Sequence, residues 1–291
     1  MRNQAFAFIK PHAMKSQAVA TYIGDVFEDG DVQVPFKKAF TNAELESGGL
    51  IDRHFESVSC ASLIEDVSKL VLSDSAKEVF KDAFNVVWDD ALAQGKIVSG
   101  KDACTRMDGM SPRKLCSEWA RYGATEIEQD ICVSWFEDND LYVLNGFYLA
   151  TRHEYVTEGA AVMTMLLDFE MDWHEFHEAI VGCENPAAAL EESIRGYLYD
   201  RAGVLEMVID PIDNIIHVSA SPFAALCEKL IWLKKAQWSK DPLLVKLVEL
   251  SGKTPSAVAK WVALKYCDTS LQALCEDKDT EIVAELLAAM L

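Results

Sequence analysis

The first sixty residues alternate between strand and helix patterns, and this order limits the fold more than any other feature of the chain. Residues 4–9 are an apolar run that Pro11 closes, because proline gives no backbone donor to a sheet. A helical pattern covers 16–29, and an alternating strand with a proline covers 32–40. A second helix, opened by a capping-box pattern, is predicted over 41–58. Strand, helix, strand, helix predicts an α/β or α+β domain.

The rest of the chain is predominantly helical in pattern. Between 60 and 152 we predict helices over 62–74 and 75–94, a turn-rich stretch over 95–114 and a strand over 141–148. Further predicted elements are a continuous buried strand over 160–170, a short helix over 173–182, an amphipathic helix over 221–238 and three or four helices from Asp241 onwards. The tail either caps the domain or docks a partner, and its leucine-rich last helix needs apolar cover in the chain or in an oligomer.

The charge balance excludes several classes of partner. The 291 residues hold 27 Lys plus Arg against 47 Asp plus Glu, a formal charge of −20. That charge repels phosphate backbones and anionic lipid, so we expect neither nucleic acid nor a membrane surface as a partner. Any pocket for an anionic ligand must therefore be locally positive.

The eight cysteines are scattered and form no C-x-x-C pair. We expect buried free thiols, with disulfides or a zinc site as the alternative. The first residues lack the apolar run of a signal peptide, and no stretch reaches transmembrane length. This favours a cytoplasmic location, with an organelle or a cilium left open.

Four segments, in order, resemble those of nucleoside diphosphate kinases. They are FIKPHA at 8–13, RHF at Arg53–Phe55, GCENPAAALEESIRG at 182–196, and NIIHVSASPFAALCEKLIW at 214–232. The last segment matches the family's active-site segment without a gap. The resemblance covers about residues 4–58 and 154–235, with roughly nine additional residues between Arg195 and Asn214.

The resemblance implies a phosphohistidine mechanism. His217 would attack the γ-phosphate of a nucleoside triphosphate and pass the phosphoryl group to a diphosphate, in ping-pong fashion. Glu228 would fix the tautomer and orientation of His217, and Ser219 would bond the transferring phosphoryl or leaving oxygen. Lys10 is the fourth catalytic residue that the family pattern indicates.

The nucleotide-binding residues follow from the same resemblance. Lys10 and Arg195 would neutralise phosphate charge, Asn214 would contact the sugar, and Phe55 takes the position of a family tyrosine. Mg²⁺ would arrive with the ATP or other nucleotide, and no protein metal site is expected. The implied partners are nucleoside di- and triphosphates, with a homo-oligomer or a subunit of a larger assembly both left open.

Several positions depart from the family pattern. Phe55 lacks the hydroxyl of the family tyrosine, and Glu178 or Ala179 stands where a phosphate-binding arginine is expected. Glu184 replaces a threonine of the phosphate-binding loop, and a charge misplaced there costs affinity. His12 replaces an aspartate. These changes support a competing hypothesis, a catalytically impaired domain that serves as a structural subunit, and a weaker one, nucleotide sensing without turnover.

The fold that the resemblance implies is α+β, with a ferredoxin-like four-stranded antiparallel sheet and packed helices. We expect a split core at 1–59 and 153–238, a long, mostly helical insertion at 60–152, and a C-terminal helical extension at 239–291. Two other motifs carry no weight. His174 and His177 lack a third metal ligand in the pattern, and SGKTP at 251–255 lacks the earlier glycine and strand of a P-loop.

Overall fold

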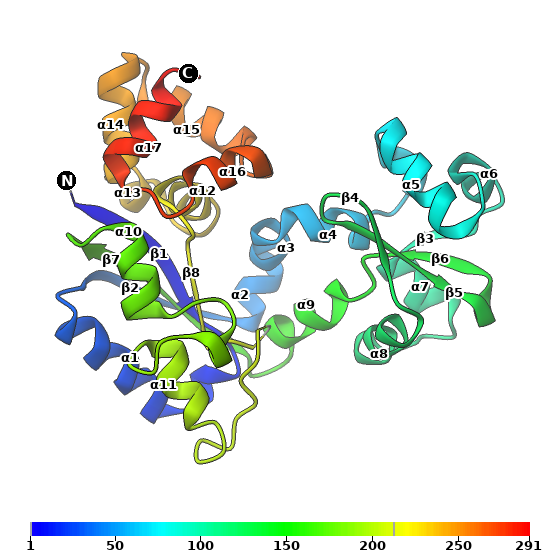
Figure 1. The fold of residues 1–291 in the computed structure, drawn as a ribbon, viewed down its shortest axis with the longest axis horizontal. Helices are drawn as coiled ribbons and strands as arrows, with labels where there is room; N and C mark the ends of the chain where they lie inside the picture. Colours follow the sequence, from blue (N-terminus) through cyan, green and yellow to red (C-terminus); the bar gives the residue numbers. More distant parts are fainter. Residues whose placement is uncertain (1, 212) are drawn as a thin grey trace. The chain divides into compact units, whose positions relative to one another are not determined.

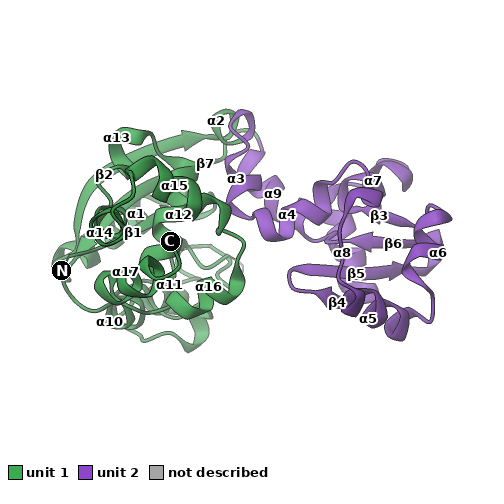
Figure 2. Ribbon diagram, turned by 90° about the horizontal axis from the view of Figure 1, so that it is seen from above, with its two compact units in different colours: residues 1–45, 158–291 green, residues 46–157 purple. Residues whose placement is uncertain are grey.

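The computed structural model describes residues 2–211 and 213–291, which form two compact units (Figure 2). The first unit holds residues 1–45 and 158–291, and the second holds 46–157. The sequence placed the limits of the insertion at 60 and 152. Each unit has its own four-stranded sheet.

The sheet of the first unit has the strand order β2-β7-β1-β8 (Figure 1). Its strands are β1 (Asn3–Ile9), β2 (Gln33–Thr41), β7 (Ala161–Phe169) and β8 (Ile216–Val218). All three neighbouring pairs are antiparallel. Numbered within this unit, the order is 2-3-1-4 with helices after the first and third strands, so the predicted α+β ferredoxin-like fold is confirmed.

Helices cover both faces of this sheet, so the β1 side chains that point to either face are buried. This explains why β1 is a continuous apolar run. Ala5, Ala7 and Ile9 face a core shared with α1 (Gln17–Asp29) and α11 (Ile194–Asp200). Phe6 and Phe8 point to the other face, where their rings pack against Trp232 of α12 (Pro222–Trp232) at 5.7 and 5.4 Å. A strand buried on both faces reads as a continuous apolar run.

The predicted edge strand and capping box both occur. β2 lies at the end of the sheet, and its register shifts between Gln33 and Phe36, around the proline that cannot donate to the ladder. The Glu44 carboxylate accepts from the Thr41 backbone N–H at 3.0 Å, which begins α2 (Asn42–Ser47). The single helix predicted over 41–58 is wrong. The chain forms α2, α3 (Leu50–His54) and α4 (Glu56–Leu63), and Gly49 has a left-handed φ of 55° between the first two.

The C-terminal extension packs on α12 and builds a second core in the first unit. Its helices are α13 (Lys235–Trp238), α14 (Pro242–Ser251), α15 (Pro255–Leu264), α16 (Thr269–Cys275) and α17 (Thr280–Ala288). Leu226 and Cys227 of α12 lie among leucines and valines of these helices. The apolar face of the last helix is covered within the chain, because Val283 and Leu287 are fully buried in this core.

The second unit is mostly helical, but it also contains a sheet that the sequence patterns only partly indicate. The strand order is β3-β6-β5-β4, with β3 and β6 parallel and the other pairs antiparallel. The elements of this unit after α4 are α5 (Asp74–Phe84), α6 (Trp88–Ala93), β3 (Ile97–Ser99), α7 (Gly100–Arg106), α8 (Pro112–Tyr122), β4 (Thr125–Glu128), β5 (Ile131–Phe136), β6 (Leu141–Leu144) and α9 (Tyr148–Val156).

Three expectations for this segment need correction. The predicted helix over 62–74 is wrong: after α4 there is only a 3-10 turn at Val67–Lys69 before α5. The helix predicted over 75–94 is divided, because Asn85 adopts a left-handed φ of 54° and ends α5. The strand predicted over 141–148 stops at Leu144, and Tyr148 already begins α9.

All eight cysteines lie within the described residues and are free thiols, as predicted. The prediction that they are buried is correct only for Cys227 and Cys275, because the other six are exposed or partly exposed. In the described part of the chain, no helix is both long and apolar enough to cross a membrane.

Candidate active site

His217 is held by the sheet in a fixed orientation. It lies in the middle of β8, directly opposite Phe8 of β1. The imidazole stacks on the Phe8 ring, with 4.8 Å between the ring centroids and 24° between the planes. About a quarter of the His217 side chain is exposed. A ligand can therefore reach a ring that cannot turn freely.

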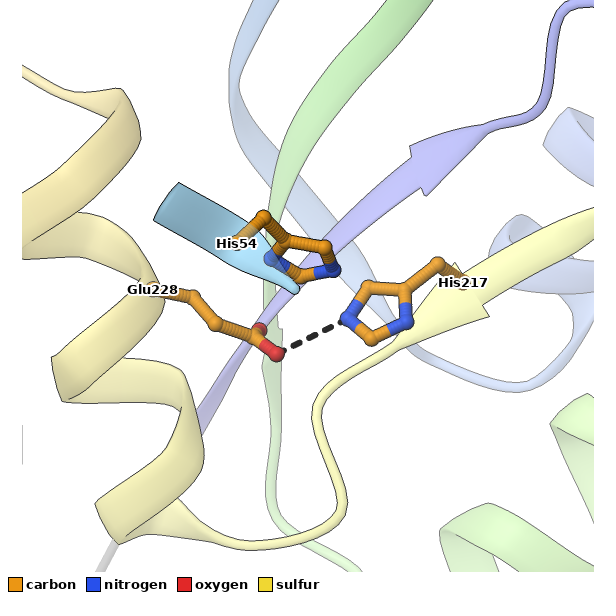
Figure 3. A group of neighbouring side chains, drawn as sticks. All are labelled: His54, His217 and Glu228. Carbon is orange, nitrogen blue, oxygen red and sulfur yellow. Dashed lines mark hydrogen bonds and ion pairs between the residues drawn. The ribbon is translucent and has the colours of Figure 1, made fainter. Parts of the chain in front are cut away.

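The Glu228 carboxylate positions His217, and the Ser219 hydroxyl positions that carboxylate. Ser221 caps α12 by accepting from the Ala224 N–H at 3.0 Å, so the helix begins three residues after β8 and brings Glu228 back over the strand. The Glu228 Oε1 atom lies 2.9 Å from His217 Nε2 (dashed line in Figure 3). The Ser219 hydroxyl donates to Glu228 Oε2 at 2.5 Å and also lies 2.9 Å from the Phe6 carbonyl oxygen.

This geometry fixes the tautomer of the histidine. An ionised carboxylate only accepts, so Glu228 requires the proton at His217 Nε2, and the lone pair is then at Nδ1. Burial, followed by the positive charges of Lys10 and Arg195, lowers the pKa of His217 well below its usual range. The ring is therefore neutral at pH 7, which is the nucleophilic form.

Two partly buried cations lie beside this histidine. The Arg195 guanidinium donates to the carbonyl oxygens of Gly182 at 2.9 Å and Ile216 at 3.0 Å, so it is anchored to the strand that carries His217. Burial, and then the Arg195 charge, lowers the pKa of Lys10 to about 8. Burial also lowers the pKa of Arg195 to about 10. The two cations disfavour each other, which is the expected signature of a site built for an anion.

Three buried polar atoms in the loops around Lys10 have no hydrogen-bond partner among the described residues. They are His12 Nε2, Arg195 Nε and Asn214 Oδ1. Asn214 is 4 % exposed and uses its amide N–H to reach the Glu184 carbonyl oxygen at 3.2 Å. Buried polar atoms are rarely left unpaired in folded proteins. A ligand that offers both donors and acceptors, as a sugar phosphate does, could satisfy this set.

Nearby carboxylates oppose the effect of burial on the pKa values of Lys10 and Arg195. The carboxylates of Asp213, Glu184 and Asp210 raise the pKa of Lys10, and Glu184 has the same effect on Arg195. Glu184 is exposed, so its charge is partly screened by water. The region around Lys10 and Arg195 is therefore less positive than these two cations alone would make it.

The remaining predicted site residue lies in the second unit. Phe55 stands between α3 and α4, where its ring packs on His54 and Tyr155 with centroid distances of 4.6 and 6.3 Å. Its assignment to nucleotide binding stays a prediction. In the first unit the structure brings the other residues together at one end of the sheet: Lys10, Arg195, Asn214, His217, Ser219 and Glu228.

One neighbour of the site was not recognised as such from the sequence. His177 Nε2 lies 2.9 Å from the Ser219 carbonyl oxygen, and Nδ1 lies 2.6 Å from Asp277 Oδ1. The sequence drew attention to His177 only as half of an H-x-x-H pair. No local pattern could link it to Asp277, which is 100 residues further along the chain.

The sequence matches no protein-family model and no curated protein. Among solved structures, it is similar to an NDP kinase from Pyrobaculum aerophilum, with 15 % identity and a TM-score of 0.40, over 81 % of this chain and 98 % of that one. It is also similar to a nucleoside diphosphate kinase from Aquifex aeolicus, with 13 % identity and a TM-score of 0.37, over 81 % of this chain and 99 % of that one. A nucleoside diphosphate kinase from Borrelia burgdorferi with bound vanadate and ADP has 13 % identity and a TM-score of 0.36, over 81 % of this chain and 89 % of that one. Similarity at this level says nothing by itself about the activity of this chain.

Proposed function

We propose that the protein is a nucleoside diphosphate kinase that works through phospho-His217. The observation that carries the proposal is the buried Glu228 carboxylate, which holds the proton of His217 at Nε2 and leaves the lone pair at Nδ1. We call the hydrogen-bonded chain Ser219–Glu228–His217 the relay. The sequence resemblance adds that its three residues match the family's active-site segment. Lys10 and Arg195 supply positive charge next to the nucleophile.

The reaction balances in two steps. In the first, the Nδ1 lone pair attacks the γ-phosphorus, an N–P bond forms, and the bond to the β-phosphate oxygen breaks to release a nucleoside diphosphate. In the second, a β-phosphate oxygen of another diphosphate attacks the phosphohistidine and the N–P bond breaks. Mg²⁺ arrives with the nucleotide as part of the substrate. Lys10 and Arg195 would neutralise charge on the phosphates, which is the main task of a phosphoryl-transfer catalyst.

The retained relay argues against a purely structural role for this site. A carboxylate that is 5 % exposed and two unpartnered buried atoms, Arg195 Nε and Asn214 Oδ1, all cost stability. A domain that served only as a scaffold would gain from apolar residues at these positions. The acidic substitutions at Glu178 and Glu184 are exposed and leave the relay itself intact.

The test is phosphoryl labelling. The protein is incubated with γ-labelled ATP and Mg²⁺, and label that is labile in acid but stable in alkali is measured. We expect label on the wild type, release of that label by GDP, and no label on His217→Ala. His153→Ala is the matched control, because His153 belongs to the second unit and has no part in the relay.

A second variant examines the tautomer. Glu228→Gln keeps the shape but presents an amide, which can force the proton of His217 onto Nδ1. We expect labelling to slow by roughly 10²- to 10⁴-fold, in line with loss of an orienting carboxylate elsewhere. Absence of label on the wild type, under conditions where an ordinary kinase of this kind is fully charged, would refute the enzyme and leave the structural role.

A further inference from the structure

The turn between α16 and α17 lies against the segment that follows His217. Asp277 in this turn has a left-handed φ of 52°, and its backbone N–H donates to the Ala220 carbonyl oxygen at 3.2 Å. Its side chain reaches His177 Nδ1 at 2.6 Å. A residue of the C-terminal extension therefore contacts the connection between β8 and α12 directly and through a histidine.

His177 connects this turn to Ser219 itself. Its Nε2 atom lies 2.9 Å from the Ser219 carbonyl oxygen, while Nδ1 faces the Asp277 carboxylate. A carbonyl oxygen and a carboxylate oxygen are both acceptors, so His177 lies between two acceptor oxygens and bridges them.

The turn is also fixed at its other end. Asp279 Oδ1 accepts from Asn3 Nδ2 at 2.8 Å and from the Trp173 backbone N–H at 2.9 Å. The backbone N–H of Thr280 donates to Asn3 Oδ1 at 3.0 Å. Asn3 begins β1, and Trp173 begins α10 (Trp173–Glu175), which continues into the π-helical turn Phe176–Val181 that carries His177. The turn between α16 and α17 is therefore attached to β1 and to the segment that carries His177.

We propose that His177 and Asp277 are positioning residues, through which the C-terminal extension holds the Ser219–Ala220 segment and keeps the Ser219–Glu228–His217 relay aligned. Ser219 has its carbonyl bound to His177 and its hydroxyl bound to Glu228. Movement of this residue would therefore change both the carboxylate and the histidine that the carboxylate orients. The kinetic part of this proposal rests on the proposed kinase function, whereas the structural part does not.

Other titratable groups also surround the His177–Asp277 contact. His217 lies near enough to His177 that the two rings influence each other electrostatically. His174 lies 3.5 Å from the other oxygen of Asp277 and 3.5 Å from Glu178. Of these groups, His177 is the one that joins Asp277 to the Ser219 carbonyl oxygen.

Two substitutions in the full chain test whether His177 and Asp277 position the Ser219–Ala220 segment. Asp277→Gly removes the carboxylate but tolerates the left-handed backbone, and His177→Phe keeps a ring against Trp173 while removing both hydrogen bonds. His174→Gln is the matched control, because His174 touches the same carboxylate but makes no contact with Ser219. Amide exchange measured by NMR reports on the Ser219 N–H, which bonds Phe6, and on the Asp277 N–H, which bonds Ala220.

We expect both amides to exchange faster by roughly two- to tenfold in the two variants, the range for one lost hydrogen bond, and to be unchanged in His174→Gln. The labelling rate of His217 should fall by roughly tenfold with unchanged nucleotide affinity. If the two amides of a folded Asp277→Gly protein exchange as slowly as in the wild type, the proposal is wrong. If His177→Phe does not fold, Asp277→Gly alone tests the proposal. If even the wild type takes no label, the kinase proposal fails, and the exchange rates still show whether His177 and Asp277 hold the Ser219–Ala220 segment.

Discussion

At the scale of single residues, Glu184 is the acidic side chain whose charge acts on both Lys10 and Arg195. Its carboxylate raises the pKa values of both Lys10 and Arg195, so its field reaches the two cations that a phosphate would need. Glu184→Thr should tighten binding of a nucleoside triphosphate by roughly two- to fivefold, the range for exposed charge pairs. Calorimetric titration measures this directly.

Glu191→Thr is the control for that change, because Glu191 is an exposed carboxylate of the same loop that is not among the main causes of the pKa shifts of the two cations. Equal effects of the two substitutions would mean that only net charge matters. Weaker binding by Glu184→Thr would show that Glu184 does not face the phosphates.

Lys10 should make nucleotide binding depend on pH in an unusual range. Burial and Arg195 lower its pKa to about 8 in the free protein, so Lys10 loses its charge as pH rises through that value. Affinity for a triphosphate should then decrease above pH 8, approaching roughly tenfold per pH unit. Titrations between pH 7.5 and 9.5 measure the slope. Lys10→Arg should remove most of the decrease, because a guanidinium stays charged.

The same shift has a consequence for stability. The pKa of Lys10 in the folded protein is below its ordinary value of 10.5, so the unfolded chain binds more protons between about 8 and 10.5. The contribution of Lys10 to the free energy of unfolding therefore rises with pH across this window and is constant below it. Comparing Lys10→Met with wild type by urea unfolding at pH 7.5 and 9.5 isolates this term. An identical pH dependence of the two proteins would contradict the assigned burial.

At the scale of elements, the start of α11 depends on the absence of a side chain at Gly196. A Cβ atom built there would lie 2.1 Å from the Leu190 carbonyl oxygen. Gly196→Ala should therefore shift the loop that precedes Arg195, destabilise the protein by ~1–3 kcal/mol and weaken nucleotide binding. Urea unfolding and a nucleotide titration test both effects.

Gly24→Ala is a control for which the expected change in stability has the opposite sign. It lies inside α1, and a Cβ there meets no atom within 4 Å. Gly24→Ala should stabilise the protein by ~0.5–1 kcal/mol, because it reduces the backbone entropy of the unfolded chain. A destabilised Gly24→Ala, or an unaffected Gly196→Ala, would show that the local packing differs from that described.

The elements that could be predicted from sequence are those whose signal is local. A two-sided apolar run marks β1 and β7, a proline marks the edge strand β2, and Thr41 with Glu44 marks the start of α2. In the second unit the sequence predicted β6 but not β3, β4 or β5, and β3 and β4 have only 3 and 4 residues. Such short strands are defined by tertiary pairing, which no local pattern contains.

The candidate site shows the same division. His217, Ser219 and Glu228 lie within twelve residues, so strand-to-helix geometry alone suggests their proximity. The contacts of Arg195 with Ile216, and of His177 with Asp277, join segments that are separated in sequence by 21 and 100 residues. They result from packing of the extension and of α11 on the sheet, which becomes visible only in the folded chain.

At the scale of the whole molecule, the second unit is inserted at one hairpin. Thr41 of β2 pairs with Ala161 of β7, and the Asn42 N–H donates to the Ala160 carbonyl oxygen at 2.9 Å. The chain therefore leaves and re-enters the first unit at neighbouring positions. Each unit has apolar cores built from its own residues.

Replacing residues 46–157 by a short Gly-Ser linker should thus leave a folded first unit. The linker only has to join two adjacent strand ends, and closing a short loop costs little entropy. Circular dichroism and an NMR amide spectrum should show the strands and the C-terminal helices intact, with a single cooperative urea transition. The labelling assay then bears on Phe55: a folded first unit that takes label without it would remove Phe55 from the site. An unfolded or aggregated product would instead show that the inserted unit stabilises the sheet from which it departs.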